Sequence, residues 1–162
     1  SDCLEDALAH GRARMMAEDA IFGWSNARVA TENGVILGGS TSYRMPEPDP
    51  SDEDVAGLKR TAPAFVPVFE LFDECVGEWF IDSLAVYPQA RGRGIGALLL
   101  DDALQKGKRA GETIASLVVE ESNHSARRLY ESRGFGIVDR RKFLEFDGPA
   151  ETSEWLLLKT EF

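Results

Sequence analysis

The chain has 162 residues, 43% of them hydrophobic and 28% charged. This is the length of one domain with an ordinary globular composition, so the composition does not predict disorder. No apolar run approaches the roughly 20 residues that a membrane-spanning helix needs. Eighteen basic residues against 28 acidic ones give a net charge of −10. Such a surface repels nucleic-acid phosphates, so we expect neither a membrane nor a nucleic acid as partner.

The two cysteines, Cys3 and Cys75, form no CxxC or Cys/His cluster. The sequence therefore predicts neither a disulfide framework nor a metal site. The acidic start of the chain also lacks the basic and apolar regions of a signal peptide, and we expect a cytoplasmic protein. The first interpretation of the negative charge is that it keeps the protein soluble. A second interpretation is attraction of a cationic partner such as an amine.

Periodicity predicts the first half of the chain as a helix over 3–19, a hairpin, a loop and a second helix. The hairpin joins strands over 27–32 and 35–45 through Asn33-Gly34, a pair that tolerates positive φ values. A loop rich in proline and acidic residues is expected over 46–54. In the helix that follows, apolar residues share one face, which we interpret as core packing. These residues are Phe65, Val68, Phe69, Phe72 and Val76.

The second half alternates strands and helices and ends in two strands. We expect strands over 78–86, 114–119, 135–146 and 154–160, and helices over 95–110 and 125–133. The last two strands are joined by a turn at Asp147-Gly148-Pro149. Such a pattern predicts an α/β fold in which helices cover a mixed sheet.

A glycine loop, Arg91-Gly92-Arg93-Gly94-Ile95-Gly96, lies between a predicted strand and a predicted helix. Glycines let the backbone N–H groups converge and the helix N-terminus favours anions, so the loop suits a pyrophosphate. A tight turn with two solvated arginines is the alternative. The spacing also fits a dinucleotide-binding fingerprint, with Glu120 at the end of the next strand. Five residues between strand and glycines, and the final hairpin, count against that interpretation. A Walker A loop is excluded because no Gly-Lys-Ser/Thr follows.

Two motifs in this order resemble those of the GNAT superfamily of N-acetyltransferases. The segment 84–96 contains the pattern Gln/Arg-x-x-Gly-x-Gly/Ala at Arg91, Gly94 and Gly96. The segment 123–135 resembles the second motif of the family, from Asn123 to Phe135. The resemblance covers roughly residues 27–160 and is tight over 78–135. It implies a three-layer domain with a mixed, mostly antiparallel sheet that splays between the strands over 78–86 and 114–119.

The resemblance implies acetyl-CoA as the donor substrate. The strand over 78–86 would pair with the pantetheine arm at Leu84 and Val86, because a free strand edge offers unpaired N–H and C=O groups. A backbone N–H near Leu84 or Ala85 would polarise the thioester carbonyl. The phosphate-binding residues would be Arg91, Gly92, Arg93, Gly94, Ile95, Gly96 and Ala97.

Catalytic residues follow from the same resemblance. Asn123 would contact the pantetheine, and it is equally suited to capping a helix. Tyr130 would be the general acid that protonates the departing thiolate, against the alternative of a packing residue. In the ribosomal-protein alanine acetyltransferases of this family, a glutamate acts as the general base at the position that Val118 occupies in this chain. Candidates for the general base are therefore Glu78, Asp82 and Glu120, acting directly or through water.

We therefore expect one domain over 1–162 that transfers an acetyl group to a primary amine of a small molecule or peptide. A non-catalytic acyl-CoA sensor or scaffold, a dinucleotide-binding oxidoreductase and a transferase of longer acyl groups remain open alternatives. A homodimer is compatible with the sequence. The chain starts at Ser1, directly in a predicted helix, which leaves room for a preceding strand and helix outside this sequence.

Overall fold

The computed structural model describes residues 2–16, 21, 23–48, 65–142 and 154–162. The chain divides into two compact units. Unit 1 comprises Ser1–Tyr43 and Ile81–Ala103, and unit 2 comprises Arg44–Phe80 and Leu104–Phe162. Among the described residues, no helix is long and apolar enough to cross a membrane.

Unit 1 contains α1 (Asp2–Met16), the short 3-10 helix η1 (Trp24–Asn26) and the hairpin of β1 (Ala27–Glu32) and β2 (Val35–Arg44) up to Tyr43. The predicted turn is confirmed: Asn33 and Gly34 have φ values of 51° and 80°, which a two-residue hairpin turn requires. Strand β3 (Trp79–Val86) enters this unit at Ile81 and is followed by η3 (Pro88–Ala90) and α4 (Ile95–Arg109).

Unit 2 contains α3 (Val66–Asp73), β4 (Ile114–Glu120), α5 (His124–Glu131), β5 (Gly136–Lys142) and β6 (Glu154–Glu161). The six strands pair in the order β1-β2-β3-β4-β6-β5. Strand β6 is antiparallel to both β4 and β5, and β1 is antiparallel to β2. The pair β3–β4 is parallel, at Trp79–Ala115 and Phe80–Ser116. The predicted mixed α/β sheet is thus confirmed.

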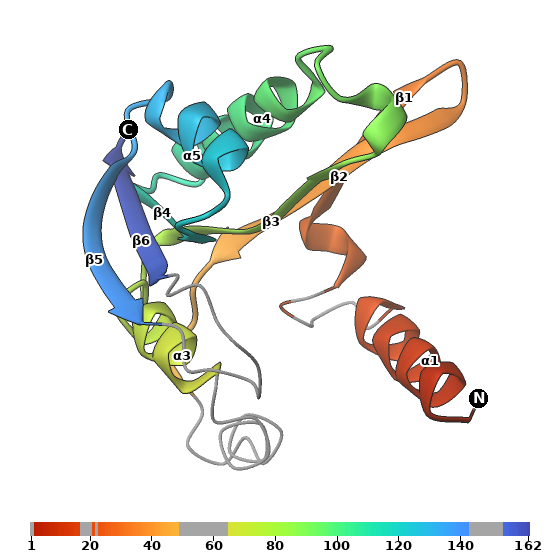
Figure 1. Ribbon diagram of the computed structural model, residues 1–162, viewed down its shortest axis with the longest axis horizontal. Coiled ribbons are helices and arrows are strands. Elements are labelled where there is room, and N and C mark those ends of the chain that lie inside the picture. The colour runs from red at the N-terminus through yellow and green to blue at the C-terminus, as the bar shows by residue number, and fades with distance from the viewer. Residues whose placement is uncertain (1, 17–20, 22, 49–64, 143–153) are drawn as a thin grey trace. The chain divides into compact units, whose positions relative to one another are not determined.

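The core of unit 2 shows why helices flank its strands on both sides. Leu156, Leu157 and Leu158 of β6 are all completely buried. Successive side chains of a strand point to opposite faces of a sheet, so three consecutive buried leucines require cover on both faces. Helix α3 contacts β4, β5 and β6, and Figure 1 shows α5 on the other side of these strands.

The sequence predicted the order and type of these elements, with ends that shift by a few residues. Helix α3 ends at Asp73, earlier than expected, and the predicted end of the first helix, over 17–19, lies outside the described residues. The predicted apolar face of α3 is confirmed in part, because Val68 is buried and the centre of the Phe72 ring lies 5.3 Å from that of the buried Phe80. The buried residues of α3 are Pro67, Val68 and Leu71, whereas Phe65 is exposed. The loop beyond residue 48, the end of the strand predicted over 135–146, and the turn at 147–149 lie outside the described residues.

Candidate functional site

The glycine loop leaves β3 through η3 and opens α4. Gly92 and Gly94 have φ values of 73° and 80°, a conformation that residues with a Cβ rarely adopt. A Cβ built on either glycine would meet no other atom within 4 Å. The first helical hydrogen bond runs from the Leu98 N–H to the Gly94 carbonyl, at 3.0 Å. The earlier N–H groups of α4, including those of Ile95, Gly96 and Ala97, have no acceptor within the helix. The loop thus offers an open backbone surface at a helix N-terminus, which fits a pyrophosphate.

Both arginines of the loop already have partners in unit 1. Arg91 Nε donates to the carbonyl oxygen of Val86 at 3.1 Å. Arg93 Nη2 lies 2.7 Å from Glu32 Oε1, at the β1–β2 turn. The side chains of this second pair are 45% and 53% exposed, so the ion pair adds little stability and can open at little cost.

The hairpin packs tightly against the end of β3. A Cβ on Gly38 would lie 2.5 Å from the carbonyl oxygen of Ala85, so only glycine allows this approach. A cavity of about 390 Å³ lies beside this contact and is lined by both hairpin strands and the segment that leads into the loop. Its lining residues include Val29, Ile36, Ala85, Val86, Tyr87 and Arg91.

Asp82 is the candidate base with the most unusual surroundings. It is half-buried in unit 1. Thr41 Oγ1 donates to its Oδ2 at 3.1 Å. Burial raises the pKa of Asp82 above its ordinary value, while hydrogen bonds from Thr41 and Tyr43 act in the opposite direction. Its partners are therefore neutral hydroxyl groups of β2, an arrangement that keeps a carboxylate able to accept a proton.

Glu78 lies in unit 2 and has a cationic partner. Its Oε1 is 2.7 Å from Lys159 Nζ of β6, and the two side chains are 16% and 22% exposed. The other carboxylate oxygen, Oε2, is buried without a hydrogen-bond partner among the described residues. Glu78 is thus engaged in an ion pair that ties the start of β3 to β6. Glu120, the third candidate, ends β4, and its carbonyl oxygen accepts from the Asn123 N–H at 3.0 Å.

Asn123 and Tyr130 lie at the two ends of α5 in unit 2. Asn123 caps this helix, since its Oδ1 accepts from the Ala126 N–H at 3.2 Å. Tyr130 is 8% exposed, and its ring centre lies 6.0 Å from that of Phe135. Burial raises the pKa of the Tyr130 phenol, so the hydroxyl carries its proton at neutral pH but releases it less readily than an exposed tyrosine would.

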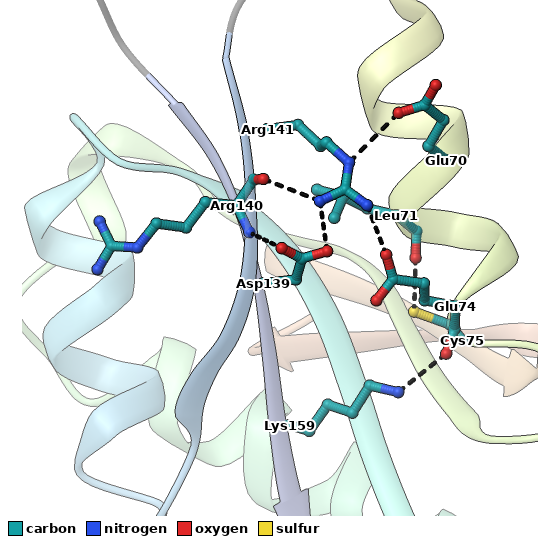
Figure 2. Close-up of polar contacts among 8 residues, drawn as sticks. All are labelled: Glu70, Leu71, Glu74, Cys75, Asp139, Arg140, Arg141 and Lys159. Atoms are coloured by element: carbon teal, nitrogen blue, oxygen red, sulfur yellow. Dashed lines mark hydrogen bonds and ion pairs between the residues drawn. The ribbon is translucent and has the colours of Figure 1, made fainter.

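A network of charged residues ties α3 to β5 in unit 2 (Figure 2). The Arg141 guanidinium reaches Glu74 Oε1 at 2.8 Å and Glu70 Oε2 at 3.3 Å, and it also binds Asp139. The backbone N–H of Arg140 and the guanidinium of Arg141 lower the pKa of Asp139. Nothing in the sequence motifs indicated this network, because its partners are about 70 residues apart. Its satisfied ion pairs indicate a structural role.

Cys75 lies beside this network and is completely buried. Its Sγ donates to the Leu71 carbonyl at 3.3 Å (Figure 2). Burial raises the pKa of the thiol to about 11. A thiol in this state is a poor nucleophile, so Cys75 is not suited to carry an acyl group.

Sequence reasoning missed Thr41, which donates to Asp82, and Ser83, which contacts Thr41. Thr41 Oγ1 lies 2.6 Å from Ser83 Oγ as well as 3.1 Å from Asp82. The available signal was the run of small polar residues Ser40, Thr41 and Ser42 in a predicted strand. Such a run does not reveal which carboxylate it will meet.

Comparison with known proteins agrees with the resemblance of the two motifs. The family model described as "Acetyltransferase (GNAT) family" matches residues 5–135. An uncharacterized N-acetyltransferase of Archaeoglobus fulgidus is 41% identical over 66 residues, which cover 40% of this chain and 44% of that protein. The ribosomal protein bS18-alanine N-acetyltransferase of Haemophilus influenzae is 39% identical over 74 residues, 46% of this chain and 50% of that protein. The chain thus matches about half of the length of these curated relatives.

A solved structure shows the same fold. A putative acetyltransferase of Salmonella typhimurium, solved with its cofactor acetyl-CoA, has a TM-score of 0.57 and 19% identity, covering 97% of this chain and 72% of its own. At this identity the likeness concerns the fold alone. The family model spans most of the chain, including both motifs and the glycine loop, and the chain therefore belongs to the acetyltransferase (GNAT) family.

Proposed function

We propose that this protein is an N-acetyltransferase that moves an acetyl group from acetyl-CoA to a primary amine. The observation that carries the proposal is the segment from β3 to α4. Its glycines hold positive φ values with open space around them, directly in front of a helix N-terminus that favours anions. This geometry fits the pyrophosphate of coenzyme A. Acetyl-CoA supplies an activated acyl group as a thioester.

The residues of β3 and the loop would bind this donor. The edge of Ile81–Val86 that faces away from β2 would pair with the pantetheine amides through backbone N–H and C=O groups. The N–H of Leu84 or Ala85 would donate to the thioester carbonyl oxygen. Arg91 and Arg93 would contact phosphate oxygens after leaving Val86 and Glu32, their partners in the structure. Asn123 remains a proposed contact of the pantetheine.

Among the three carboxylates, Asp82 is the proposed general base. Among the described residues its partners are hydroxyl groups, whereas Glu78 is paired with Lys159. Its raised pKa lies closer to neutrality than that of an ordinary aspartate, which favours proton acceptance. Asp82 also lies on the strand that carries Leu84, two residues away. Tyr130 is the proposed general acid, supported by its protonated state and by the family motif.

The acceptor is proposed to be an amine that carries positive charge before it binds, since the chain has a net charge of −10. A panel of small-molecule and peptide amines, with acetyl-CoA as donor and release of free thiol as readout, tests the function. Turnover of at least one amine supports the proposal. Tight acetyl-CoA binding without turnover of any amine would favour a sensor or scaffold. This alternative is supported by Val118, which stands where the ribosomal-protein alanine acetyltransferases have the glutamate that acts as general base.

A further inference from the structure

Three side chains of unit 1 form a chain of hydrogen bonds between β2 and β3. Thr41 Oγ1 lies 3.1 Å from Asp82 Oδ2 and 2.6 Å from Ser83 Oγ. Consecutive residues of a regular strand point to opposite faces of the sheet. Asp82 and Ser83 are consecutive, yet both reach one hydroxyl group. Thr41 therefore connects two neighbouring residues of β3, one of which is the proposed base.

The chemistry of the groups fixes the direction of this chain. An ionised carboxylate only accepts hydrogen bonds, and a threonine hydroxyl has one hydrogen to donate. Thr41 therefore donates to Asp82, and Ser83 must donate to Thr41. Ser83 is exposed, whereas Asp82 is half-buried. The hydrogen bonds thus lead from an exposed hydroxyl, through Thr41, to a half-buried carboxylate.

We propose that Ser83 and Thr41 relay the proton of the acceptor ammonium to Asp82. The N–H bond of the ammonium breaks as its proton binds Ser83 Oγ. The Ser83 hydroxyl proton passes to Thr41 Oγ1, and the Thr41 hydroxyl proton passes to Asp82 Oδ2. The products are a neutral amine, a protonated Asp82 and two intact hydroxyl groups. This inference rests on the proposed function, in which Asp82 is the base.

The surroundings of the relay are consistent with this role. Among the described residues, hydrogen bonds from Thr41 and Tyr43 of β2 lower the pKa of Asp82, whereas burial raises it. Asp82 can therefore change charge without breaking an ion pair. Ser83 directly precedes Leu84, one of the two proposed donors to the thioester carbonyl. The exposed end of the relay is thus one residue from a group proposed to bind the reacting carbonyl.

The relay is tested by removing one hydroxyl at a time from the full chain. Thr41→Val keeps the shape of the side chain, and Thr41→Ser keeps the hydroxyl and serves as its control. We expect Thr41→Val to lower kcat by about 10–100-fold, toward the low end of the effect of a positioned base. The acid limb of the kcat–pH profile of this variant should move to higher pH, because Asp82 loses a hydrogen bond that stabilises its charged form. Thr41→Ser should restore both.

Ser83→Ala separates relay from positioning. It leaves the bond from Thr41 to Asp82 in place, so kcat should fall while the acid limb and the affinity for acetyl-CoA stay unchanged. Carbon-13 NMR titration of the Asp82 carboxyl gives a readout independent of activity: its pKa should rise in Thr41→Val and stay near the wild-type value in Ser83→Ala.

The outcomes distinguish the relay from the proposed base. If Ser83→Ala and Thr41→Val keep wild-type kcat where chemistry limits the rate, while Asp82→Asn is impaired, the relay is wrong and Asp82 acts directly. If Asp82→Asn also keeps wild-type kcat, the proposed base itself fails. Should Thr41→Val not fold, Ser83→Ala decides alone, because its exposed hydroxyl can be removed with little effect on packing.

Discussion

Asp82 and Glu78 lie four residues apart in the sequence, at β3 and just before it, and the structure gives them opposite partners. Asp82 accepts hydrogen bonds from hydroxyl groups, and burial raises its pKa. Glu78 is paired with Lys159 at 2.7 Å. Asp82 can therefore gain a proton without breaking an ion pair among the described residues, whereas Glu78 belongs to one. Burial raises the pKa of Asp82, and the absence of a cationic partner among the described residues separates it from the ion-paired Glu78.

The sharpest way to break this comparison is Asp82→Asn. The asparagine side chain can still accept from Thr41 but cannot take a proton at neutral pH. We expect kcat to fall by about 10²–10⁴-fold, the range for loss of a positioned base, with acetyl-CoA affinity unchanged. Steady-state kinetics together with calorimetry check this. Because the pKa of Asp82 is raised, the acid limb of wild-type kcat should lie above the pKa of an ordinary aspartate.

The same variant has a predicted effect on stability. A carboxyl whose pKa is raised by folding stabilises the native state below its unfolded pKa, and this contribution is lost as pH rises through the folded pKa. At neutral pH the charged Asp82 is therefore unfavourable, and the melting temperature of Asp82→Asn should be no lower than that of the wild type. A clear decrease would show that Asp82 has a structural role.

Tyr130→Phe extends the comparison to a phenol. The substitution keeps the packing against Phe135, so thermal stability should change little. The chemical step should slow by about 10²-fold, the lower end for a positioned acid, since a thiolate is a good leaving group. Single-turnover kinetics measure this step, and unchanged acetyl-CoA affinity is the control. A loss explained entirely by weaker cofactor binding would make Tyr130 a binding residue.

Gly94→Val tests whether the loop binds phosphates, and it leaves Asp82 and Glu78 unchanged. The positive φ of Gly94 disfavours any side chain. Acetyl-CoA affinity should fall more than about tenfold, or by about 1.4 kcal/mol or more. Gly136→Val is a matched control, because Gly136 has equally open surroundings without a positive φ. Unchanged affinity of a folded Gly94→Val in calorimetry would refute the phosphate-binding role.

Glu78→Gln gives the smallest expected effect and completes the comparison. It removes the charge that faces Lys159 but leaves an oxygen that can accept from it, so the free energy of unfolding should fall by about 0.5–1.5 kcal/mol, the net scale of one ordinary hydrogen bond. A chemical denaturation curve measures this, and a double-mutant cycle with Lys159→Gln isolates the pair. Activity should stay within a few-fold of wild type. A loss of kcat as large as that of Asp82→Asn would reverse the roles given to the two residues.

The sequence predicted those parts of the fold that depend on local signals. Asn33-Gly34 placed the hairpin turn, and the glycine motif placed the loop between β3 and α4. The partners of the candidate bases could not be predicted, because they come from distant strands: Thr41 is 41 residues from Asp82, and Lys159 is 81 residues from Glu78. The buried face of α3 was predicted only in part, since Val68 is buried as expected, whereas Leu71 is buried in place of Phe65. The apolar residues of α3 lie on several sides of the helix, so periodicity alone did not select the buried face.

Strand β6 provides an internal reference for all these measurements. It is paired along both edges, and Leu156, Leu157 and Leu158 are buried on both faces. Backbone amides in such a strand exchange their hydrogens with solvent only when the protein unfolds globally. The exchange rates of these three amides therefore report the global free energy of unfolding under native conditions. In Asp82→Asn and Glu78→Gln they would reveal a gain or a loss of stability without any denaturant.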